Sequence, residues 1–519
     1  CQATSFITLK NIKSKNRVNV LPYVYGGLDG NTAKGSLDYG KLVTNVGISG
    51  LFDINNLSSL EYAINPDFSQ VEADVSQISA NNTFAIFFQE RRPYFNEGND
   101  IIETNLKTVY TRSINKPLLS TKLISQGENQ RMYWLTAYDE ASPYLIAGEN
   151  QSYFGEGTAS YSNIFRYQRT YDQGSNLGLI TTNRIFKNGG YGHLLGLDGR
   201  YRFKKSYTAI FELNKSLVLE PQADWIEEND RIGKKNTQLN GETLHGDALF
   251  FSLARNTRNW NSKIQYQQYS PHFQTPLGFV TQNSIRTLEG AHEYQHFYDP
   301  DDFIKQLWVF ASSKIQFNYA NLRKYLDLGT GLYLQLSGNI QSNFGYNYIV
   351  NEEFEGFNAQ GMHDFELFIS FNPTEKVRLG MFTNFGESLR YDADAPAVGN
   401  NFFMGTFNDF QFTPKIRFSP SFRYSQLKNK TTGDLYFSGF IARANLNYQF
   451  NPTLSFRLIG ELNDFDKGFF FQPLLKWNPN PFTIFYIGGT NGYSRIENKN
   501  QYTIENSQLY LKFQYLFDW

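Results

Sequence analysis

The feature that most constrains this chain is an alternation of apolar and polar residues that recurs along its length and is clearest at the C-terminus. Residues 507–519 read SQLYLKFQYLFDW, with a large apolar residue at every second position from Leu509 to Trp519. Polar residues or a tyrosine fill the positions between them, with Leu516 as the exception. Because successive side chains of a β-strand point to opposite faces, this period predicts a strand with one apolar and one more polar face.

This last strand favours a lipid-facing position over a soluble core. A soluble core rarely needs six large apolar residues on one face of its final strand, whereas a strand that faces lipid does. Outer-membrane barrels end with such a strand and with an aromatic residue. We therefore expect a C-terminal barrel signal made of Leu511, Phe513, Tyr515, Phe517 and Trp519.

About two dozen segments of this kind follow one another along the chain, separated by turn signals. Residues 207–214, 376–386 and 415–426 are examples, and NPT at 372–374 is one of the turns. A membrane-crossing strand of ~9–11 residues and its connection together use roughly 20–25 residues. A chain of 519 residues therefore predicts an all-β fold, a single transmembrane antiparallel β-barrel of about 22–26 strands over residues 1–519.

Composition agrees with a closed barrel. The chain holds 47 Phe and 34 Tyr, yet its mean hydropathy is negative. Both are expected when apolar lipid-facing and polar lumen-facing residues alternate and aromatic residues gather at the two membrane boundaries. The soluble alternatives are a propeller or a set of β-sandwiches, but no repeat of roughly 40–50 residues supports a propeller.

Charge and cysteine content exclude other classes. The chain has 48 Lys and Arg against 49 Asp and Glu, a net charge of −1, which gives no global reason to bind nucleic acid. The single cysteine, Cys1, excludes a disulfide scaffold and a multi-cysteine metal site, and we predict no metal or cofactor. Cys1 itself has two interpretations, a lipid-modified cysteine left by lipoprotein processing or the point where a longer chain was cut.

Residues 65–98, NPDFSQVEADVSQISANNTFAIFFQERRPYFNEG, break the alternation and carry too many close charges to face lipid. Lumenal charges of both signs pair with one another, and an arginine can bind a carboxylate bidentately. The segment is therefore interpreted as a lumenal plug or constriction tied to the wall by ion pairs, or alternatively as an external loop with solvated charges. The candidate latch residues are Asp67, Glu72, Asp74, Glu90, Arg91, Arg92 and Glu97. We expect another charged stretch, residues 226–241, to be a long solvated loop.

Two motifs in this region resemble a known family. NPDFSQVEAD at 65–74 and FFQERRPYFNEG at 87–98 are similar to the signature of an outer-membrane barrel family of Bacteroidota, catalogued as a domain of unknown function. Residues 9–27 resemble the start of the family's barrel, and the resemblance covers essentially the whole chain. It implies a large outer-membrane barrel and supplies no activity, catalytic residue or ligand. The family-9 carbohydrate-binding-like module that usually precedes the barrel is missing from this sequence.

Enzyme motifs are weak. HEYQH, from His292 to His296, matches the H-E-x-x-H zinc motif, which requires a helix to bring both imidazoles to one metal. The surrounding sequence has no helical apolar stripe, so we expect two histidines on one face of a strand, about 13 Å apart. A hydrolase with a spatial catalytic triad is a minor alternative, without a G-x-S-x-G elbow to support it. The chain is therefore predicted not to be an enzyme.

The predicted function is a gated or plugged conduit in the bacterial outer membrane for a solute or a polypeptide. A barrel of about 22 or more strands has a lumen that wall side chains alone do not fill, so an internal segment must occlude it. Expected partners are outer-membrane lipid, the barrel-insertion machinery during biogenesis, and other outer-membrane or surface proteins. The alternative function is a non-conducting scaffold or subunit of a secretion or assembly complex that docks through its rim and loops. Exposed aromatic loop tips would favour it, and residues 154–161 and 401–410 are candidates that could also be strand ends.

Overall fold

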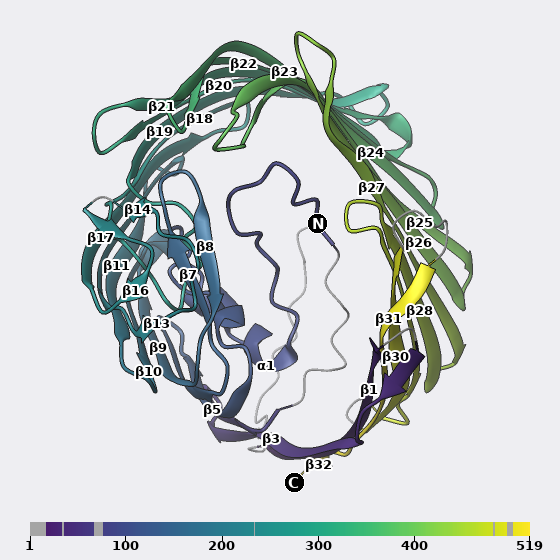
Figure 1. The fold of residues 1–519 in the computed structure, drawn as a ribbon. Coiled ribbons are helices and arrows are strands. Elements are labelled where there is room, and N and C mark those ends of the chain that lie inside the picture. The colour runs from purple at the N-terminus through teal and green to yellow at the C-terminus, as the bar shows by residue number, and fades with distance from the viewer. Residues whose placement is uncertain are drawn as a thin grey trace, which may run out of the picture.

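The computed structural model describes residues 17–33, 36–66, 76–232, 234–480, 483–495 and 502–518. Within these residues, 24 strands form the wall of one closed antiparallel barrel (Figure 1), which confirms the all-β prediction and its strand number. The wall strands are β1 (Val18–Ala33), β3 (Val43–Asn55), β4 (Ser58–Ile64), β5 (Pro117–Gln126), β6 (Gln130–Asp139), β9 (Ser160–Thr170), β10 (Asn176–Phe186), β11 (Tyr191–Phe203), β12 (Tyr207–Leu219), β17 (Thr243–Asn256), β18 (Trp260–Tyr269), β19 (Ile285–Phe297), β20 (Ile304–Asn318), β21 (Arg323–Leu336), β22 (Ile340–Phe354), β23 (Phe357–Thr374), β24 (Val377–Arg390), β25 (Ala397–Thr413), β26 (Ile416–Asn429), β27 (Leu435–Asn451), β28 (Leu454–Asn463), β29 (Gly468–Trp477), β30 (Ile484–Arg495) and β31 (Tyr502–Gln514).

Shorter elements extend the wall at its seam or lie in its connections. They are β2 (Ser36–Tyr39), β7 (Pro143–Ala147), β8 (Ser152–Glu156), β13 (Gln222–Ala223), β14 (Arg231–Ile232), β15 (Lys235–Asn236), β16 (Leu239–Asn240), β32 (Phe517–Asp518), the helices α1 (Pro93–Asn96) and α2 (Asn99–Ile102), and the 3₁₀ turns η1 (Thr111–Ser113), η2 (Asp172–Gly174) and η3 (Ser337–Asn339). Among the described residues, no helix has the length and hydropathy that crossing a membrane requires.

Each wall strand pairs with the next wall strand in the sequence, and the seam closes between the first and the last of them. In the seam, β1 pairs with β31 in a register that places Gly27 opposite Tyr510. The tightest hairpins need special backbone conformations. Glu355 and Gly356 connect β22 to β23 and both have positive φ, 47° and 82°, as a two-residue type I′ turn requires.

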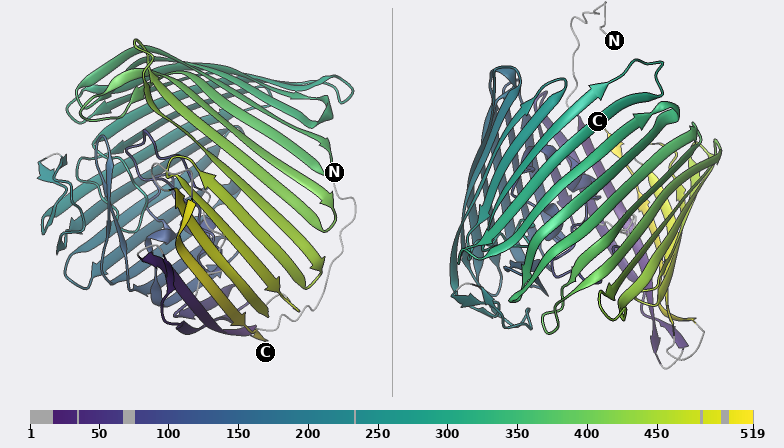
Figure 2. Two further views of the ribbon diagram at one scale, coloured as in Figure 1. Left: turned by 45° about the vertical axis from the view of Figure 1, so that its right-hand side comes forward. Right: turned by 90° about the horizontal axis from the view of Figure 1, so that it is seen from above.

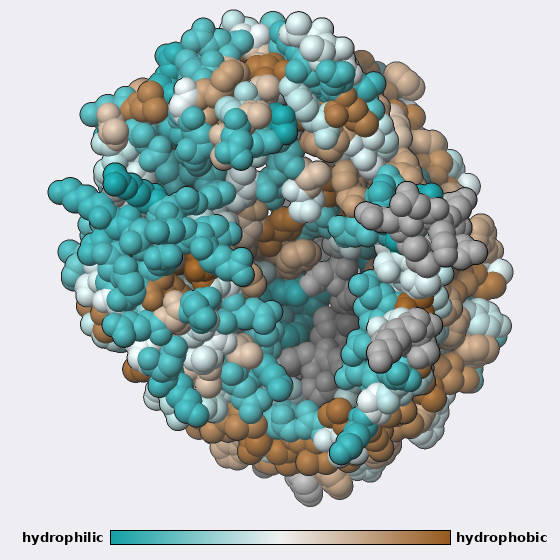
Figure 3. Space-filling view, in the orientation of Figure 1, coloured by the Kyte–Doolittle hydropathy of each residue, from teal (hydrophilic) through white to brown (hydrophobic). Residues whose placement is uncertain are grey.

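The alternation predicted for the last strand is present in the barrel. The side chains of Leu509, Leu511 and Phe513 are 42–46% exposed on the outer face of the wall, whereas those of Tyr510 and Lys512 are 5% and 2% exposed. In Figure 3, hydrophobic residues gather along the lower and right-hand outer edge of the wall, and hydrophilic residues cover the region of β13–β16. The outer surface of the wall is therefore apolar while its inner face is polar.

The two rims of the barrel differ in the length of their connections. One rim, here the short-turn rim, carries brief turns such as residues 56–57 and 204–206, and β1 begins and β31 ends there. The opposite rim, the long-loop rim, carries the longest connections, 65–116, 140–159, 220–242 and 270–284. Side views show the tilted strands running between these rims (Figure 2).

The connection from β4 to β5 lies inside the ring of strands and carries α1, α2 and η1 (Figure 1). The hairpin β7–β8 and the connection 270–284 contact each other, with a parallel bridge between Gly148 and Gln282. The expectation that residues 226–241 form a solvated loop is wrong for its apolar residues. Ile226 and Leu239 are buried in a cluster with Tyr144, because they cover the apolar side of β7–β8.

Candidate functional site

The described part of the β4–β5 connection, residues 76–116, is called the internal segment. Its apolar side chains pack on the inner face of one part of the wall. Phe95, Ile101 and Ile102 are fully buried there against Ile124 and Tyr133. This packing fixes α1 and α2 against β5 and β6.

Gly98 joins α1 to α2 at the point of closest approach to the wall. Its φ is 74°, and a Cβ at this position would lie 2.7 Å from Cδ1 of Ile124. Only glycine combines this positive φ with so close a contact. The turn between the two helices therefore depends on a residue without a side chain.

Three buried cations of the wall donate hydrogen bonds to carbonyl groups of the internal segment. Lys122 Nζ on β5 lies 2.5 Å from the carbonyl oxygen of Tyr94 and 3.1 Å from that of Glu97. Arg166 Nε on β9 lies 3.1 Å from the carbonyl oxygen of Ile101. Arg184 Nη2 on β10 lies 2.7 Å from the carbonyl oxygen of Ser113.

Two wall carboxylates accept hydrogen bonds from backbone N–H groups of the segment. Glu212 Oε2 on β12 accepts from Asn105 N at 2.8 Å and from Leu106 N at 3.2 Å. Asp139 at the end of β6 accepts from Asn115 N at 2.8 Å and from Lys116 N at 2.6 Å, where the segment leads into β5. Both signs of wall charge therefore bind the backbone of the segment and its exit.

The wall cations are themselves paired, as burial in a protein requires. Lys122 Nζ lies 2.9 Å from Glu61 Oε2 on β4. Arg166 Nη2 lies 2.9 Å from Asp198 Oδ1 on β11, and Arg184 lies 3.6 Å from Asp139. Each ion pair and the carbonyl groups it binds form one hydrogen-bonded cluster. Removing one member of a pair leaves the other charge buried without a partner, which costs about 3–5 kcal/mol of stability.

Of the predicted latch residues, the structure brings Glu90 and Arg92 together. Arg92 Nε and Nη2 donate to the two carboxylate oxygens of Glu90 at 2.8 and 2.7 Å, the bidentate geometry expected of arginine. Arg92 also donates to the carbonyl oxygens of Ile114 and Thr111 at 2.7 and 2.9 Å. Burial alone would raise the pKa of Glu90, but the hydrogen bonds and charge of Arg92 hold that pKa below its usual value.

The Glu90–Arg92 pair joins two parts of the internal segment and does not join the segment to the wall. Arg91 lines a cavity described below, and the side chain of Glu97 is exposed while its carbonyl binds Lys122. An ion pair joins Asp100 on α2 to Arg131 on β6, two residues that the sequence did not single out. The remaining candidates, Asp67, Glu72 and Asp74, lie outside the described residues.

The C-terminal signal residues are distributed as follows. Leu511 and Phe513 lie on β31, and Phe517 lies on β32, with exposed side chains. Tyr515 lies between these strands, also exposed, and its ring contacts that of Phe517 at a centroid distance of 4.8 Å. Trp519 lies outside the described residues.

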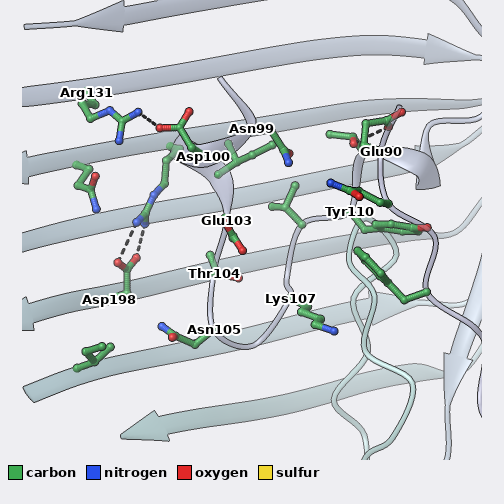
Figure 4. A pocket seen from close by; sticks show the side chains of 18 of the residues that line it. Glu90, Asn99, Asp100, Glu103, Thr104, Asn105, Lys107, Tyr110, Arg131 and Asp198 are labelled. Atoms are coloured by element: carbon green, nitrogen blue, oxygen red, sulfur yellow. Dashed lines mark hydrogen bonds and ion pairs between the residues drawn. The ribbon is translucent and has the colours of Figure 1, made fainter. Parts of the chain in front are cut away.

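Two cavities flank the internal segment. The short-turn cavity, about 1180 Å³, is lined near the short-turn rim by Arg131, Asp198 and Arg200 (Figure 4). The long-loop cavity, about 730 Å³, is lined by residues of β8 and of the connection 270–284 at the opposite rim. Both volumes are in the range of small-molecule sites, ~300–1,000 Å³, or slightly above it.

An aromatic cluster separates these cavities and is called the aromatic triad, Phe87, Tyr110 and Phe279. Phe87 lines the short-turn cavity, Phe279 lines the long-loop cavity, and Tyr110 lines both. The ring centroids lie 4.9–5.3 Å apart, a spacing typical of favourable aromatic contacts. Tyr110 is fixed because its hydroxyl donates to the carbonyl oxygen of Phe88 at 2.7 Å and its N–H to that of Leu277 at 2.7 Å.

The histidines of the HEYQH motif lie on strand β19, as expected. Nδ1 of His292 lies 2.7 Å from Oγ of Ser262, and its ring stacks on Trp260 with a centroid distance of 5.2 Å. Among the described residues, no group of three or more His, Cys, Asp or Glu side chains is placed to hold a metal ion. His292 therefore takes part in a pair of polar and aromatic contacts on the wall.

Comparison with solved structures finds many chains, and the three given next have low sequence identity to this chain. The siderophore receptor PirA from Acinetobacter baumannii matches at 10% identity and a TM-score of 0.47, over 98% of this chain and 81% of the receptor. A mutant ferric enterobactin receptor, PfeA from Pseudomonas aeruginosa, in complex with enterobactin, matches at 8% identity and 0.47, over 96% and 81%. The copper transporter OprC matches at 8% identity and 0.46, over 96% and 80%. No curated protein sequence matches this chain.

One family model matches a part of this chain that includes the two motifs at 65–74 and 87–98. The matched part is shorter than the whole-chain resemblance expected from the sequence, and it ends within β6. Both motifs lie inside it, which confirms the resemblance to a family of unknown function over that stretch. Residues 14–133 of this chain match the model of the family described as Domain of unknown function (DUF5916).

Proposed function

We propose that this chain is a bacterial outer-membrane β-barrel that acts as a gated conduit for a small solute, with the internal segment as its plug. The observation that carries the proposal is the set of buried wall charges on β5, β6, β9, β10 and β12 that bind backbone groups of the segment and its exit. A scaffold that needs only a filled lumen has no use for a segment held by charges, since apolar packing fills space at lower desolvation cost.

The outer surface supports a membrane location. Large apolar side chains such as Trp134, Leu195 and Phe251 are exposed on wall strands, and exposed apolar surface over a closed sheet is stable in lipid. Outer-membrane barrels have short periplasmic turns and longer extracellular loops. By this rule the short-turn rim faces the periplasm and the long-loop rim faces outward.

The width of the barrel supports a plug. A wall of 24 strands encloses a lumen that wall side chains do not fill. The internal segment lies in that lumen, leads into β5 at the long-loop rim and brings its own apolar residues, Phe95 and Ile101 among them. Lipid and the barrel-insertion machinery are the partners this architecture requires.

The scaffold alternative drew on residues 154–161 and 401–410 as loop tips or strand ends. Phe154 lies on β8, and residues 401–410 lie on the wall strand β25. This placement gives the scaffold less support than the internal geometry gives the conduit. The conduit is the function that the internal geometry supports best.

Deletion of the segment tests the proposal. Ile64 pairs with Leu119 across β4 and β5, so a short Gly–Ser linker in place of residues 66–116 closes an ordinary hairpin. We expect the deletion variant to give a larger and steadier conductance than the parent in planar bilayers. The matched control shortens the loop 430–434, which joins β26 to β27 at the same rim.

Folding of each variant is checked by its heat-dependent migration in detergent gels, which reports a closed barrel independently of conductance. A folded deletion variant that conducts no better than the parent or the loop control would refute the plug. Equal gains in the deletion variant and in the loop control would also refute it, since the gain would then come from the rim.

A further inference from the structure

The long-loop cavity differs from the short-turn cavity in chemistry as well as position. Nine charged side chains line the short-turn cavity, whereas two, Arg112 and Glu156, line the long-loop cavity. Its remaining lining is largely apolar or aromatic, with Phe84, Ile86, Leu145, Phe154, Pro276 and Phe279 among its residues. A solute that reaches the barrel from the long-loop rim meets this apolar chamber before the charged one.

The charged groups of the long-loop cavity are of opposite sign, and the arginine is engaged by the internal segment. Arg112 Nη1 donates to the carbonyl oxygen of Gln89 at 3.0 Å, and its guanidinium lies 5.6 Å from the ring centroid of Phe88. These charges give no net preference for an anion or a cation. Neutral polar groups are available from Asn115 and Ser79, whose side chains are exposed.

The aromatic triad closes the inner end of the chamber. Rings at this spacing offer edges and faces to another planar ring, since aromatic side chains prefer offset or edge-to-face contacts. Phe154 on β8 also lines the cavity and is 61% exposed. A planar ring in the chamber would therefore find aromatic surface from β8 as well as from the triad.

We propose that the long-loop cavity is a binding site for a small neutral molecule with a planar aromatic body and a few hydroxyl groups. This inference rests on the proposed function, because it makes that molecule the solute class the conduit selects. The chamber holds the ring against Phe154 and the aromatic triad, and Asn115 and Ser79 supply the neutral hydrogen-bonding groups. Such sites are commonly apolar with a few placed polar groups.

Binding of two matched sugars to the purified full-length barrel tests this site. The probes are phenyl β-D-glucoside and methyl β-D-glucoside, which share the sugar and differ in the aromatic ring. Both are titrated into the parent by calorimetry, with empty detergent micelles as the blank. We expect heat of binding for the phenyl glucoside and none for the methyl glucoside.

Two variants locate the site. Phe154→Ala removes one aromatic wall of the chamber, and we expect its Kd for phenyl glucoside to be about 3–10-fold weaker, the range of one aromatic contact. Phe303→Ala is the control, because Phe303 is similarly exposed, at 66%, in the turn between β19 and β20 at the short-turn rim. It is expected to bind like the parent, and both variants are checked for heat-dependent gel migration.

No binding of phenyl glucoside to the parent, equal binding of the two sugars, or unchanged binding by Phe154→Ala would each overturn the site. These outcomes are distinct from failure of the conduit. A barrel that gains conductance on deletion of the internal segment and binds neither sugar keeps its proposed function and loses this site. A barrel that binds phenyl glucoside as expected and gains no conductance keeps the site and loses the plug.

Discussion

The contact between Lys122 and the internal segment gives the sharpest test of how the segment is held. Lys122 is fully buried on β5. Its Nζ lies 2.9 Å from Glu61 Oε2, 2.5 Å from the carbonyl oxygen of Tyr94 and 3.1 Å from that of Glu97. The perturbation is a pair of variants, Lys122→Met alone and Lys122→Met combined with Glu61→Leu.

The two variants separate two costs. Lys122→Met alone leaves the Glu61 carboxylate buried without its cation, and we expect the barrel to lose about 3–5 kcal/mol of stability. The double variant replaces the pair by apolar residues of similar volume, which is often close to neutral for the whole fold. Both variants remove the two hydrogen bonds to the segment's carbonyl groups.

The loss of those two bonds predicts a local effect. Hydrogen bonds that involve a charged group contribute about 1.5–3 kcal/mol each, so the double variant lowers the free energy of local opening by roughly 3 kcal/mol or more. Because each 1.4 kcal/mol is about tenfold, amide exchange over residues 93–103 should accelerate about 100-fold. Exchange in the wall strand β6 should change little.

Hydrogen exchange followed by mass spectrometry measures this difference peptide by peptide. The matched control is Lys314→Met with Glu289→Leu, a half-exposed pair 3.9 Å apart on β20 and β19. Its atoms contact neither α1 nor α2 in the described structure. If amide exchange over residues 93–103 in the double variant stays within about twofold of the parent's rate, the claim that Lys122 ties the segment to the wall is refuted.

Three further predictions follow from charges and exposure. Burial raises the pKa of Glu220, just beyond β12, to about 7. The folded state therefore favours the protonated carboxyl, and the free energy of unfolding that this group contributes is lost as pH rises from about 4.5 through 7. The ratio of the parent's trypsin cutting rate within residues 226–241 to that of a Glu220→Gln variant should therefore be several-fold higher at about pH 8 than at about pH 5, and an unchanged ratio would contradict this. For Glu90 the pKa is lowered, so the stabilisation is present above about pH 4.5 and is lost on acidification. The protection of the internal segment's amides, taken relative to their intrinsic exchange rate at each pH, should therefore fall in acid, and a Glu90→Gln variant that shows the same acid response would contradict this. On the outer face, Leu509→Arg near the middle of β31 should cost about 2–4 kcal/mol in urea unfolding, whereas Gln508→Arg on the opposite face should cost less, and equal costs would contradict the assignment of faces.

The wall was predictable because its signal is local. A strand that separates lipid from lumen must alternate at every second residue, so Leu511 and Phe513 on one face and Lys512 on the other identify the two faces without knowledge of the partner strands. The same local rule gives the number of strands, since each crossing uses a similar length of chain. Closure of the barrel follows because an open edge in lipid leaves backbone groups without hydrogen bonds.

The interior was predictable only in part. The dense charges at 65–98 predict a segment that does not face lipid, and the pairing of Glu90 with Arg92 follows from the affinity of arginine for carboxylates. Glu90 and Arg92 lie two positions apart and bind each other. The prediction that the charges of 65–98 tie the segment to the wall stays a prediction, because Asp67, Glu72 and Asp74 lie outside the described residues.

The residues that hold the segment could not be found from its own charges, because the groups that the wall cations bind are backbone carbonyls. Every residue carries a carbonyl, so no residue type identifies the ones that Lys122, Arg166 and Arg184 contact. A signal does exist on the wall side. Each of these cations stands on a strand at a position that faces the lumen, where an unpaired charge would be costly, and each has its carboxylate partner on a different strand. A large cation at the inward position of a barrel strand therefore predicts that something inside the barrel covers it, and the internal segment of this chain provides that cover.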